Sequence, residues 1–321
     1  MPDRVGRSVE VLLHGPAVAS MRPRIEEAYA TAAWWEQADA SAFLAHHGPS
    51  IRAIVADGSL PIAHSLLQDL PGLSLVACVG SGFEAMDLAY LKARGVAVTH
   101  APGLNSGDVA DFAVLLLLAQ ARGLNAGQEL FWSGQWGHRR AERRRSIQAL
   151  KVGIVGLGAI GAAVAARLEA FGCRMSWWGP RDKPSVAWPR LASLSDLARA
   201  SDALILTLRA DEKTRGVIDA SVIEDLGPDG IIVNVARGSV LDEDALMAAL
   251  REGRLAGAAL DVYGQEPADP RRWRDVPNLL ATPHMAAATN ESLNAMVGAL
   301  MENLRRAFAG EPPFSPVPES P

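Results

Sequence analysis

The feature that most constrains this chain is a short apolar run that ends in three regularly spaced glycines. Residues 152–155 are apolar, as in a buried parallel strand, and the glycines follow in the spacing G-x-G-x-x-G. An alanine-rich helical pattern continues over residues 159–171. In such a unit the glycines permit a tight turn and close approach of the backbone, while the amide end of the helix faces a pyrophosphate. The pattern therefore predicts a dinucleotide-binding unit, with the binding residues Gly156, Gly158, Ala159, Ile160 and Gly161.

Length and composition indicate two α/β domains. Two domains are expected for 321 residues, and 49% apolar against 21% charged residues suits well-packed α/β folds. The net charge of −5 argues against a general nucleic-acid binder, and the arginine cluster within 139–145 is expected to be a solvated surface. Cys78 and Cys173 lie in apolar runs and offer neither a disulfide framework nor a metal site.

No segment has the pattern of a signal peptide or a membrane span. Residues 1–7 are polar and charged, and Glu10 and His14 interrupt the apolar run that follows. The longest purely apolar run, Phe112–Ala119, is too short to cross a bilayer. We therefore expect a cytoplasmic protein without a membrane partner.

Short apolar runs alternate with helical patterns along most of the chain, which predicts βα units and parallel sheets. In the first hundred residues the expected strands are 9–13, 51–55, 73–79 and 96–99, and the expected helices are 23–30, 62–70 and 86–94. In the second series the expected strands are 151–155, 173–178, 203–208, 231–236, 257–262 and 278–282. The helices expected there are 159–171, 194–200, 220–226, 242–252 and 286–309.

A long helix is expected between the two series, over residues 106–122. Its centre, Val114–Leu118, is apolar on every side, which indicates burial by a neighbouring domain or by a second subunit. Residues 123–146 are polar and arginine-rich and are expected to be irregular. The last helix, 286–309, could return to pack on the first domain, and the proline-rich residues 312–321 are expected to form a loose tail.

The end of the strand over 173–178 bears on the choice between NAD(H) and NADP(H). An acidic residue usually stands there and binds the ribose 2′-OH of NAD. This chain has Gly179, followed by Arg181, Asp182 and Lys183. The missing acid removes repulsion against a 2′-phosphate, and Arg181 and Lys183 can attract one. We favour NADP(H), while NAD(H) stays possible and an ordinary charged surface turn is the alternative interpretation.

Further motifs follow the fingerprint or precede it in a recognisable order: Val79–Gly82, Asn105–Asp111, Asn234–Gly238, Ala259–Pro267 and Thr282–His284. Together they closely resemble the D-isomer-specific 2-hydroxyacid dehydrogenase family over about residues 70–290. The resemblance implies two doubly wound parallel-sheet α/β domains. One is a Rossmann cofactor domain over 101–286, and the other is a smaller flavodoxin-like substrate domain of residues 1–100 plus 287–321.

The resemblance gives chemical roles to three matching residues. Arg237 is similar to the arginine that holds the substrate's carboxylate and carbonyl oxygen, because a guanidinium fork can bind two oxygens of a planar 2-oxo acid. His284 is similar to the general acid–base that protonates the carbonyl oxygen as hydride reaches C2. Glu266 is similar to the carboxylate that orients the imidazole and favours its charged form.

Other residues are expected to bind cofactor or substrate. Asp261 stands where the family's acid contacts the nicotinamide side of the cofactor, and Thr207 and Ala236 are expected to line the cofactor as well. Backbone amides are placed to bind the substrate carboxylate in a loop whose glycines leave them open to an anion, namely Gly80, Ser81 and Gly82.

Each of these residues also has an ordinary structural interpretation. Arg237 could form a surface ion pair, His284 could cap a helix or fill the core, and Glu266 could end a strand. Arg209 stands where family members often carry proline or a small residue and could touch cofactor or substrate. Trp136 could line a pocket, even that of a partner subunit.

The favoured function is reduction of a small 2-oxo acid, such as glyoxylate or hydroxypyruvate, by NADPH. One alternative is an NAD-dependent dehydrogenase resembling the D-3-phosphoglycerate enzyme, against which Gly179 counts. Another is a dinucleotide-sensing corepressor without enzymatic activity. A homodimer is expected, because the family commonly dimerises through its cofactor domain.

Overall fold

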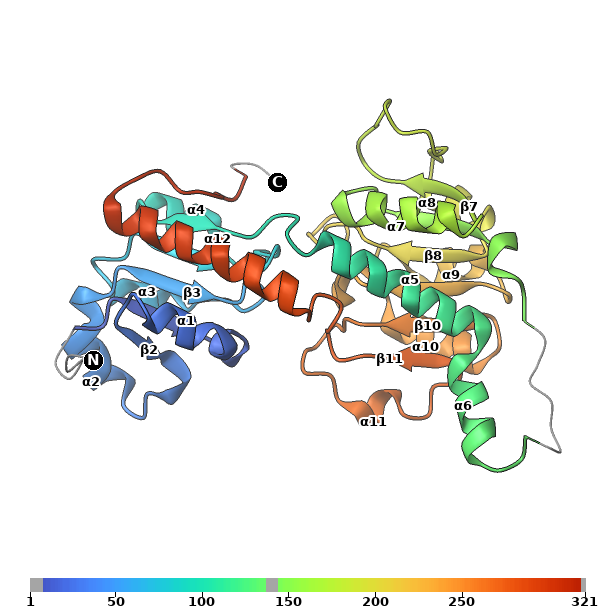
Figure 1. The fold of residues 1–321 in the computed structure, drawn as a ribbon, viewed down its shortest axis with the longest axis horizontal. Coiled ribbons are helices and arrows are strands. Elements are labelled where there is room, and N and C mark those ends of the chain that lie inside the picture. The colour runs from blue at the N-terminus through green and yellow to red at the C-terminus, as the bar shows by residue number, and fades with distance from the viewer. Residues whose placement is uncertain (1–7, 137–143, 319–321) are drawn as a thin grey trace. The chain divides into compact units, whose positions relative to one another are not determined.

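A computed structural model describes residues 8–136 and 144–318. Its contacts divide the chain into two compact units, one of residues up to 105 together with those from 289 onward, the other of residues 106–288. Each unit contains one parallel sheet with helices packed on it (Figure 1). The predicted α/β class with two parallel-sheet domains is therefore confirmed.

The sheet of the first unit has five strands in the order β2-β1-β3-β4-β5, all parallel. This is the flavodoxin-like order, in which the crevice for a ligand lies beside the carboxyl ends of β1 and β3. The strands are β1 (Val11–His14), β2 (Thr31–Ala33), β3 (Ala53–Ala56), β4 (Leu75–Cys78) and β5 (Ala97–Thr99).

Short helices connect these strands, and two of them begin at an aspartate whose side chain accepts a hydrogen bond from the first turn. The prediction missed β2 and α2, because the three residues of β2 pair only with β1 at the sheet's edge and α2 buries no residue. The helices are α1 (Arg22–Glu26), α2 (Ala40–His47), α3 (His64–Gln68) and α4 (Leu88–Ala93), with 3-10 turns η1 (Pro16–Met21), η2 (Trp34–Glu36) and η3 (Gly48–Ser50).

The C-terminal helix α12 (Asn290–Ala309) covers one face of this first sheet (Figure 1). Leu300 and Leu304 are buried in one cluster with Val11, Leu13 and Val55 of the strands. Burial of this apolar face against the strands stabilises both elements.

The segment after α12 is not a loose tail, so that expectation is wrong for the residues described up to 318. Asn303, which is 3% exposed, accepts hydrogen bonds from the amides of Phe314 and Ser315. Val317 then donates its amide to Val98 of β5 at 3.0 Å, in antiparallel pairing. A buried amide side chain and an unpaired sheet edge thus hold a segment that its proline content alone could not place.

The sheet of the second unit has six parallel strands in the order β11-β10-β9-β8-β6-β7. Strand β6 has β7 on one side and β8 on the other, so the chain order reverses there and a ligand crevice is expected at its carboxyl end. The strands are β6 (Lys151–Val155), β7 (Arg174–Trp178), β8 (Ala203–Leu206), β9 (Ile231–Asn234), β10 (Gly257–Leu260) and β11 (Leu279–Ala281).

The long helix α5 (Ser106–Arg122) agrees with its predicted bounds and packs within this unit against the helix that follows β6 (Figure 1). The residues 123–146 are not wholly irregular, because α6 occupies part of them. Gly123 adopts a left-handed conformation with φ 61°, which ends α5 and lets a second helix begin. The remaining elements are α6 (Leu124–Trp132), α7 (Ala159–Ala170), α8 (Leu194–Arg199), α9 (Ala220–Leu226), α10 (Glu243–Arg251), α11 (Pro270–Trp273), η4 (Ile147–Ala149) and η5 (Gly238–Val240).

Of the arginine cluster, residues 139, 140 and 143 lie outside the described part of the chain, while Arg145 pairs with Asp202 at 2.6 Å. Within 8–136 and 144–318, no single helix is long and apolar enough to cross a membrane. Only the bent pair of α5 and α6 taken together meets that criterion, by length and composition.

Candidate active site

The glycine fingerprint forms the turn between β6 and α7. Gly156 has φ 93°, a conformation that side chains rarely adopt, and its amide donates to Trp178 of the neighbouring strand at 2.8 Å. A Cβ on Gly161 would lie 2.3 Å from the Gly156 carbonyl oxygen, so the helix passes the turn at a distance that only glycine allows. A Cβ on Gly158 would instead meet open space. The turn is thus closed towards the sheet and open at the helix N-terminus, a shape that fits a pyrophosphate.

The other predicted residues of this turn have distinct places. Ala159 begins α7 and is exposed, and Ile160 behind it is partly buried. Thr207, after β8, donates its hydroxyl to the Gly156 carbonyl at 2.7 Å. Its side chain therefore braces the turn, and its expected contact with the cofactor stays a prediction.

The carboxyl end of β7 carries the residues on which the cofactor preference depends. A Cβ on Gly179 would lie 4.0 Å from the Cα of Gly156, so Gly179 stands beside the fingerprint turn. Arg181 is exposed and Lys183 is partly buried. No acidic side chain occupies the strand end, as the sequence indicated, and two cationic side chains follow it within four residues.

A second group of predicted site residues lies at the carboxyl ends of β9, β10 and β11. Arg237 follows β9 in a loop that is held by Asn234, which is fully buried. The Asn234 side chain donates to the Arg237 carbonyl and accepts from the Ala236 amide, each at 3.0 Å. Ala236 itself is 8% exposed. Asn234 belongs to one of the sequence motifs, but its positioning role depends on contacts that only the structure shows.

Gly238 brings two loops of the site together. A Cβ there would lie 1.8 Å from the backbone carbon of Tyr263, so the loop after β9 and the loop after β10 touch through their main chains. The Gly264 amide then donates to Glu243 at 2.6 Å. The glycine that follows Arg237 is thus required by packing, and the contact sets the loop carrying Glu266 beside the loop carrying Arg237.

Asp261 is fully buried at the end of β10, and its carboxylate holds the loop that follows β11. It accepts hydrogen bonds from the amides of Met285 and Ala286, both at 2.9 Å, and from the Thr282 hydroxyl at 2.6 Å. Its main-chain oxygen accepts the amide of His284 at 2.8 Å. The carboxylate is therefore engaged within the protein, and its expected contact with the nicotinamide side stays a prediction.

His284 and Glu266 form the pair that the sequence predicted. The ring Nδ1 of His284 lies 2.6 Å from Oε2 of Glu266, and the other carboxylate oxygen accepts the amide of Tyr263 at 2.9 Å. His284 has φ 51°, an uncommon conformation for a residue other than glycine. Asp261 accepts the amides of His284, Met285 and Ala286, so the backbone that carries the ring is held in place, and 44% of the His284 side chain remains accessible.

The pair also has the expected electrostatics. The hydrogen bond to Glu266 outweighs desolvation and raises the pKa of His284 above its usual value. Burial by itself would raise the pKa of Glu266, but the bonds from His284 and from the Tyr263 amide outweigh it and lower that pKa. Arg237 contributes in both cases, lowering the pKa of each partner through its charge. The three predicted catalytic residues therefore share one electrostatic environment.

In the first unit, the loop after β4 carries the predicted carboxylate-binding amides. Its carbonyls are engaged, since Ala101 donates to the oxygen of Gly80 at 2.8 Å and His100 Nδ1 lies 3.0 Å from the oxygen of Ser81. A Cβ on Gly58 would lie 1.9 Å from the oxygen of Gly82, so a second glycine allows this close packing. None of the described residues accepts a hydrogen bond from the three loop amides, those of Gly80, Ser81 and Gly82.

The two residues to which the sequence assigned no definite role, Arg209 and Trp136, are both exposed. Arg209 follows β8, and its main-chain oxygen accepts the hydroxyl of Thr214 at 2.9 Å. Trp136 is 71% exposed in the segment after α6. Their expected contacts with ligand or partner stay predictions.

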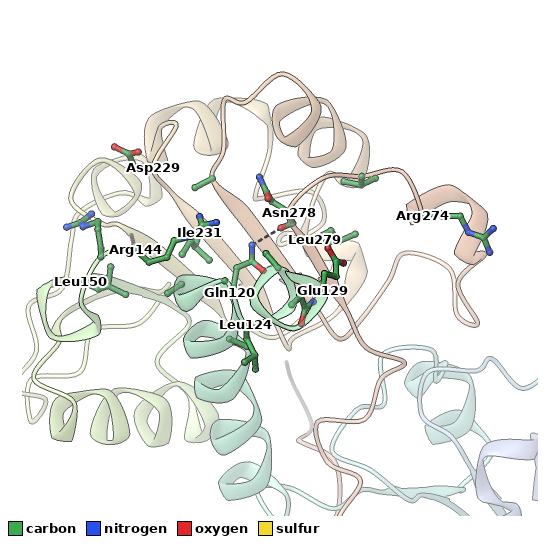
Figure 2. A pocket seen from close by; sticks show the side chains of 18 residues that line it. Gln120, Leu124, Glu129, Arg144, Leu150, Asp229, Ile231, Arg274, Asn278 and Leu279 are labelled. Carbon is green, nitrogen blue, oxygen red and sulfur yellow. Dashed lines mark hydrogen bonds between the residues drawn. The ribbon is translucent and has the colours of Figure 1, made fainter. Parts of the chain in front are cut away.

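A hollow of about 480 Å³ lies at the opposite end of the second sheet (Figure 2). Its lining includes Leu150 before β6, Ile231 at the start of β9 and Leu279 at the start of β11. Gln120 of α5 donates to the Asn278 carbonyl across it at 2.7 Å, as the dashed line in Figure 2 marks. Ligands of open parallel sheets bind at the carboxyl ends of strands, so this hollow is not the site of the fingerprint and the His284 pair.

Comparisons with known proteins agree with this geometry. A family model described as D-isomer specific 2-hydroxyacid dehydrogenase, NAD binding domain, matches residues 114–286. Glyoxylate/hydroxypyruvate reductase A of Arabidopsis thaliana is 36% identical over 310 residues, which cover 97% of this chain and 99% of that protein. The solved structure of a 2-hydroxyacid dehydrogenase from Ketogulonicigenium vulgare Y25 is 38% identical, with a TM-score of 0.90 and coverage of 97% and 98%.

A further solved structure is that of an NADPH-dependent glyoxylate/hydroxypyruvate reductase from Sinorhizobium meliloti in complex with NADP and malonate. It is 33% identical, with a TM-score of 0.88, and the match covers 98% of each chain. The chain described here therefore belongs to the D-isomer specific 2-hydroxyacid dehydrogenases, oxidoreductases that use a nicotinamide dinucleotide.

Proposed function

We propose that this protein reduces a small 2-oxo acid to the D-2-hydroxy acid, with NADPH as the hydride donor. The observation that carries the proposal is the His284–Glu266 pair at 2.6 Å, in the electrostatic environment of Arg237. The relatives named glyoxylate/hydroxypyruvate reductase support glyoxylate or hydroxypyruvate as the substrate.

The chain's own residues have separate tasks in this reaction. The bound reduced nicotinamide supplies the hydride that adds to C2 of the substrate. Arg237 holds the substrate's carboxylate and 2-oxo oxygen through its two-pronged guanidinium. His284 donates a proton from Nε2 to the 2-oxo oxygen, since its Nδ1 is engaged by Glu266. Glu266 stabilises the imidazolium before transfer.

Turnover tests the function directly. Purified protein with NADPH should reduce glyoxylate or hydroxypyruvate, followed by the loss of reduced-cofactor absorbance. His284→Ala should lower kcat by roughly 10²–10⁴-fold, the usual contribution of a general acid, while nucleotide affinity stays unchanged. An absence of turnover across a panel of 2-oxo acids would favour a dinucleotide-sensing role instead. Oxidation of D-3-phosphoglycerate with NAD would favour the biosynthetic alternative.

We also propose that NADPH is preferred over NADH. Gly179 removes the carboxylate that would repel a 2′-phosphate, and Arg181 and Lys183 add positive charge behind it. Comparing kcat/KM for the two cofactors tests the preference, and equal values or a preference for NADH would contradict it. Arg181→Ala should raise the KM for NADPH and leave that for NADH nearly unchanged.

We propose a homodimer, because apolar side chains stand exposed on one stretch of the second unit. Leu115 of α5 is 53% exposed, and α6 adds Leu124 at 58%, Phe131 at 57% and Trp132 at 74%. Exposed apolar surface of this extent is typical of a contact with another protein. Light scattering at micromolar concentration should give a dimer mass for the wild type and a smaller mass for Phe131→Glu/Trp132→Glu. A wild-type monomer would refute the proposal.

The two cysteines, Cys78 and Cys173, are free and buried. Free thiols suit a reducing compartment, so we extend the proposal to a cytoplasmic location, which cell fractionation tests.

A further inference from the structure

Strand β7 has an additional neighbour on its outer edge that the sequence did not reveal. The segment 188–191 runs parallel to it, with an isolated bridge between Trp177 and Arg190. The Trp177 amide donates to Pro189 at 2.9 Å, and the Leu191 amide donates to Trp177 at 2.8 Å. The Trp177 indole nitrogen adds a bond to the Trp188 oxygen at 3.0 Å. Arg190 therefore has a fixed main-chain position beside the carboxyl end of β7.

The side chain of Arg190 is also held in place. One guanidinium nitrogen donates to the carbonyl oxygen of Gly179 at 2.8 Å. The guanidinium carbon lies 5.7 Å from the ring centroid of Trp177, a cation–π distance, and Trp177 is only 2% exposed. Two separate contacts thus restrict the rotamer of a side chain that ordinarily has much freedom.

Its charge is placed where a ribose substituent would stand. Gly179 follows β7 directly and lies beside Gly156 of the fingerprint turn, and an acid at this strand end would bind a ribose 2′-OH. Within residues 8–136 and 144–318, no carboxylate forms an ion pair with Arg190. A guanidinium has five N–H donors, so the bond to Gly179 leaves several of them for a further acceptor.

We propose that Arg190 binds the 2′-phosphate of NADP(H) and is the main residue that selects this cofactor over NAD(H). The inference rests on the proposed NADPH preference and deepens it. Arg181 and Lys183 assist by attraction. Arg190 contributes more, because its guanidinium is already oriented and loses little freedom on binding.

The affinities for NADP⁺ and NAD⁺ test this role of Arg190, and their measurement does not depend on turnover. Isothermal titration of the full-length protein with NADP⁺ and NAD⁺ gives the ratio of the two dissociation constants. Arg190→Gln should weaken NADP⁺ by about 10–100-fold, the loss of one or more hydrogen bonds to a charged group. It should change NAD⁺ by less than about 3-fold, because NAD⁺ presents a hydroxyl at that position. Adenosine 2′,5′-bisphosphate should lose its ability to compete with NADP⁺ in the variant.

Arg174→Gln is the matched control, since Arg174 begins the same strand and is exposed at its opposite end. It should leave both dissociation constants unchanged. Arg190→Lys separates charge from geometry and should recover only part of the selectivity, because an ammonium lacks the planar fork.

The possible outcomes distinguish a failure of the proposed NADPH preference from a failure of the proposed role of Arg190. A wild type that binds NADP⁺ and NAD⁺ equally overturns the NADPH preference and this inference together. A wild type that prefers NADP⁺, with the ratio unchanged in Arg190→Gln, overturns the role of Arg190 and leaves the preference intact. Equal weakening of both nucleotides in Arg190→Gln would assign Arg190 a purely structural role and also overturn the inference.

Discussion

In the proposed mechanism, the reaction depends on the protonation state of the His284 imidazole. As the donor in carbonyl reduction it must be charged, so activity is present below its pKa and is lost as the pH rises through that pKa. Glu266 raises this pKa through the hydrogen bond to Nδ1. The carboxylate thereby extends activity towards alkaline pH.

Glu266→Gln keeps the size of the side chain and removes its charge. The pKa of His284 should fall, and the alkaline limb of the kcat/KM profile for reduction should move to lower pH. The pH dependence of kcat/KM measures the shift, and Glu224→Gln, an exposed residue of α9, is the control. An alkaline limb identical to that of the wild type would show that Glu266 does not tune His284.

Asp261 acts on His284 from within the core. It holds the amides of Met285 and Ala286, on the C-terminal side of a residue with positive φ. Asp261→Asn would turn an amide NH₂ towards at least one of these donors and should lower stability by about 1–3 kcal/mol. It should also reduce kcat, because the ring loses its fixed position.

Denaturant unfolding and kcat check both effects together. Asp229→Asn, on an exposed turn of the same unit, should change neither quantity. A variant at Asp261 with lower stability but unchanged kcat would refute the positioning role.

At the level of elements, the site depends on loops that approach through their main chains. Gly238 lets the turn after β9 contact the loop after β10, and Gly161 lets α7 pass close to the fingerprint turn. Both approaches occur at the carboxyl end of the sheet, where ligands of this fold bind. The positions of the His284–Glu266 pair and of Arg237 thus depend on contacts that involve none of these three side chains.

Gly238→Ala should therefore abolish activity and lower the melting temperature. The free energy of unfolding should fall by more than the ~1–3 kcal/mol typical of overpacking in a core. The new Cβ would overlap main-chain atoms of Tyr263, which cannot move aside as the end of a flexible side chain can. Gly298→Ala in α12 is the control, since its Cβ would meet no atom within 4 Å. That variant should be slightly stabilised, by up to about 1 kcal/mol, as alanine replaces glycine in a helix. A Gly238→Ala variant with the melting temperature and the activity of the wild type would show that this close contact is not required.

At the level of the whole molecule, the two units draw their hydrophobic clusters from the sequence in different ways. The two clusters of the second unit draw only on residues 109–287. Those of the first unit combine strands before residue 100 with side chains after residue 292. The second unit is continuous in sequence, whereas the first needs both ends of the chain.

The fragment of residues 106–288 should therefore fold alone and unfold cooperatively. The fragment of residues 1–105 should not, because Val11 and Leu13 lose the cover of Leu300 and Leu304. Joining residues 289–321 to it through a flexible linker should restore a cooperative transition. Circular dichroism during heating measures all three, and cooperative unfolding of 1–105 by itself would contradict the prediction.

Local patterns in the sequence determined the fingerprint turn, the six strands of the second sheet and the bounds of α5, because strand, turn and helix signals act over a few neighbouring residues. The resemblance of the sequence motifs to a known family identified Arg237, Glu266 and His284 as candidates. Only the tertiary structure decided how distant segments meet: the Asp261 clamp on the His284 loop, the pairing of Val317 with β5, and the position of Arg190 beside Gly179. These contacts depend on the order of the strands in each sheet and on hydrogen bonds that polar groups form with distant segments. Neither produces a periodic pattern in the sequence.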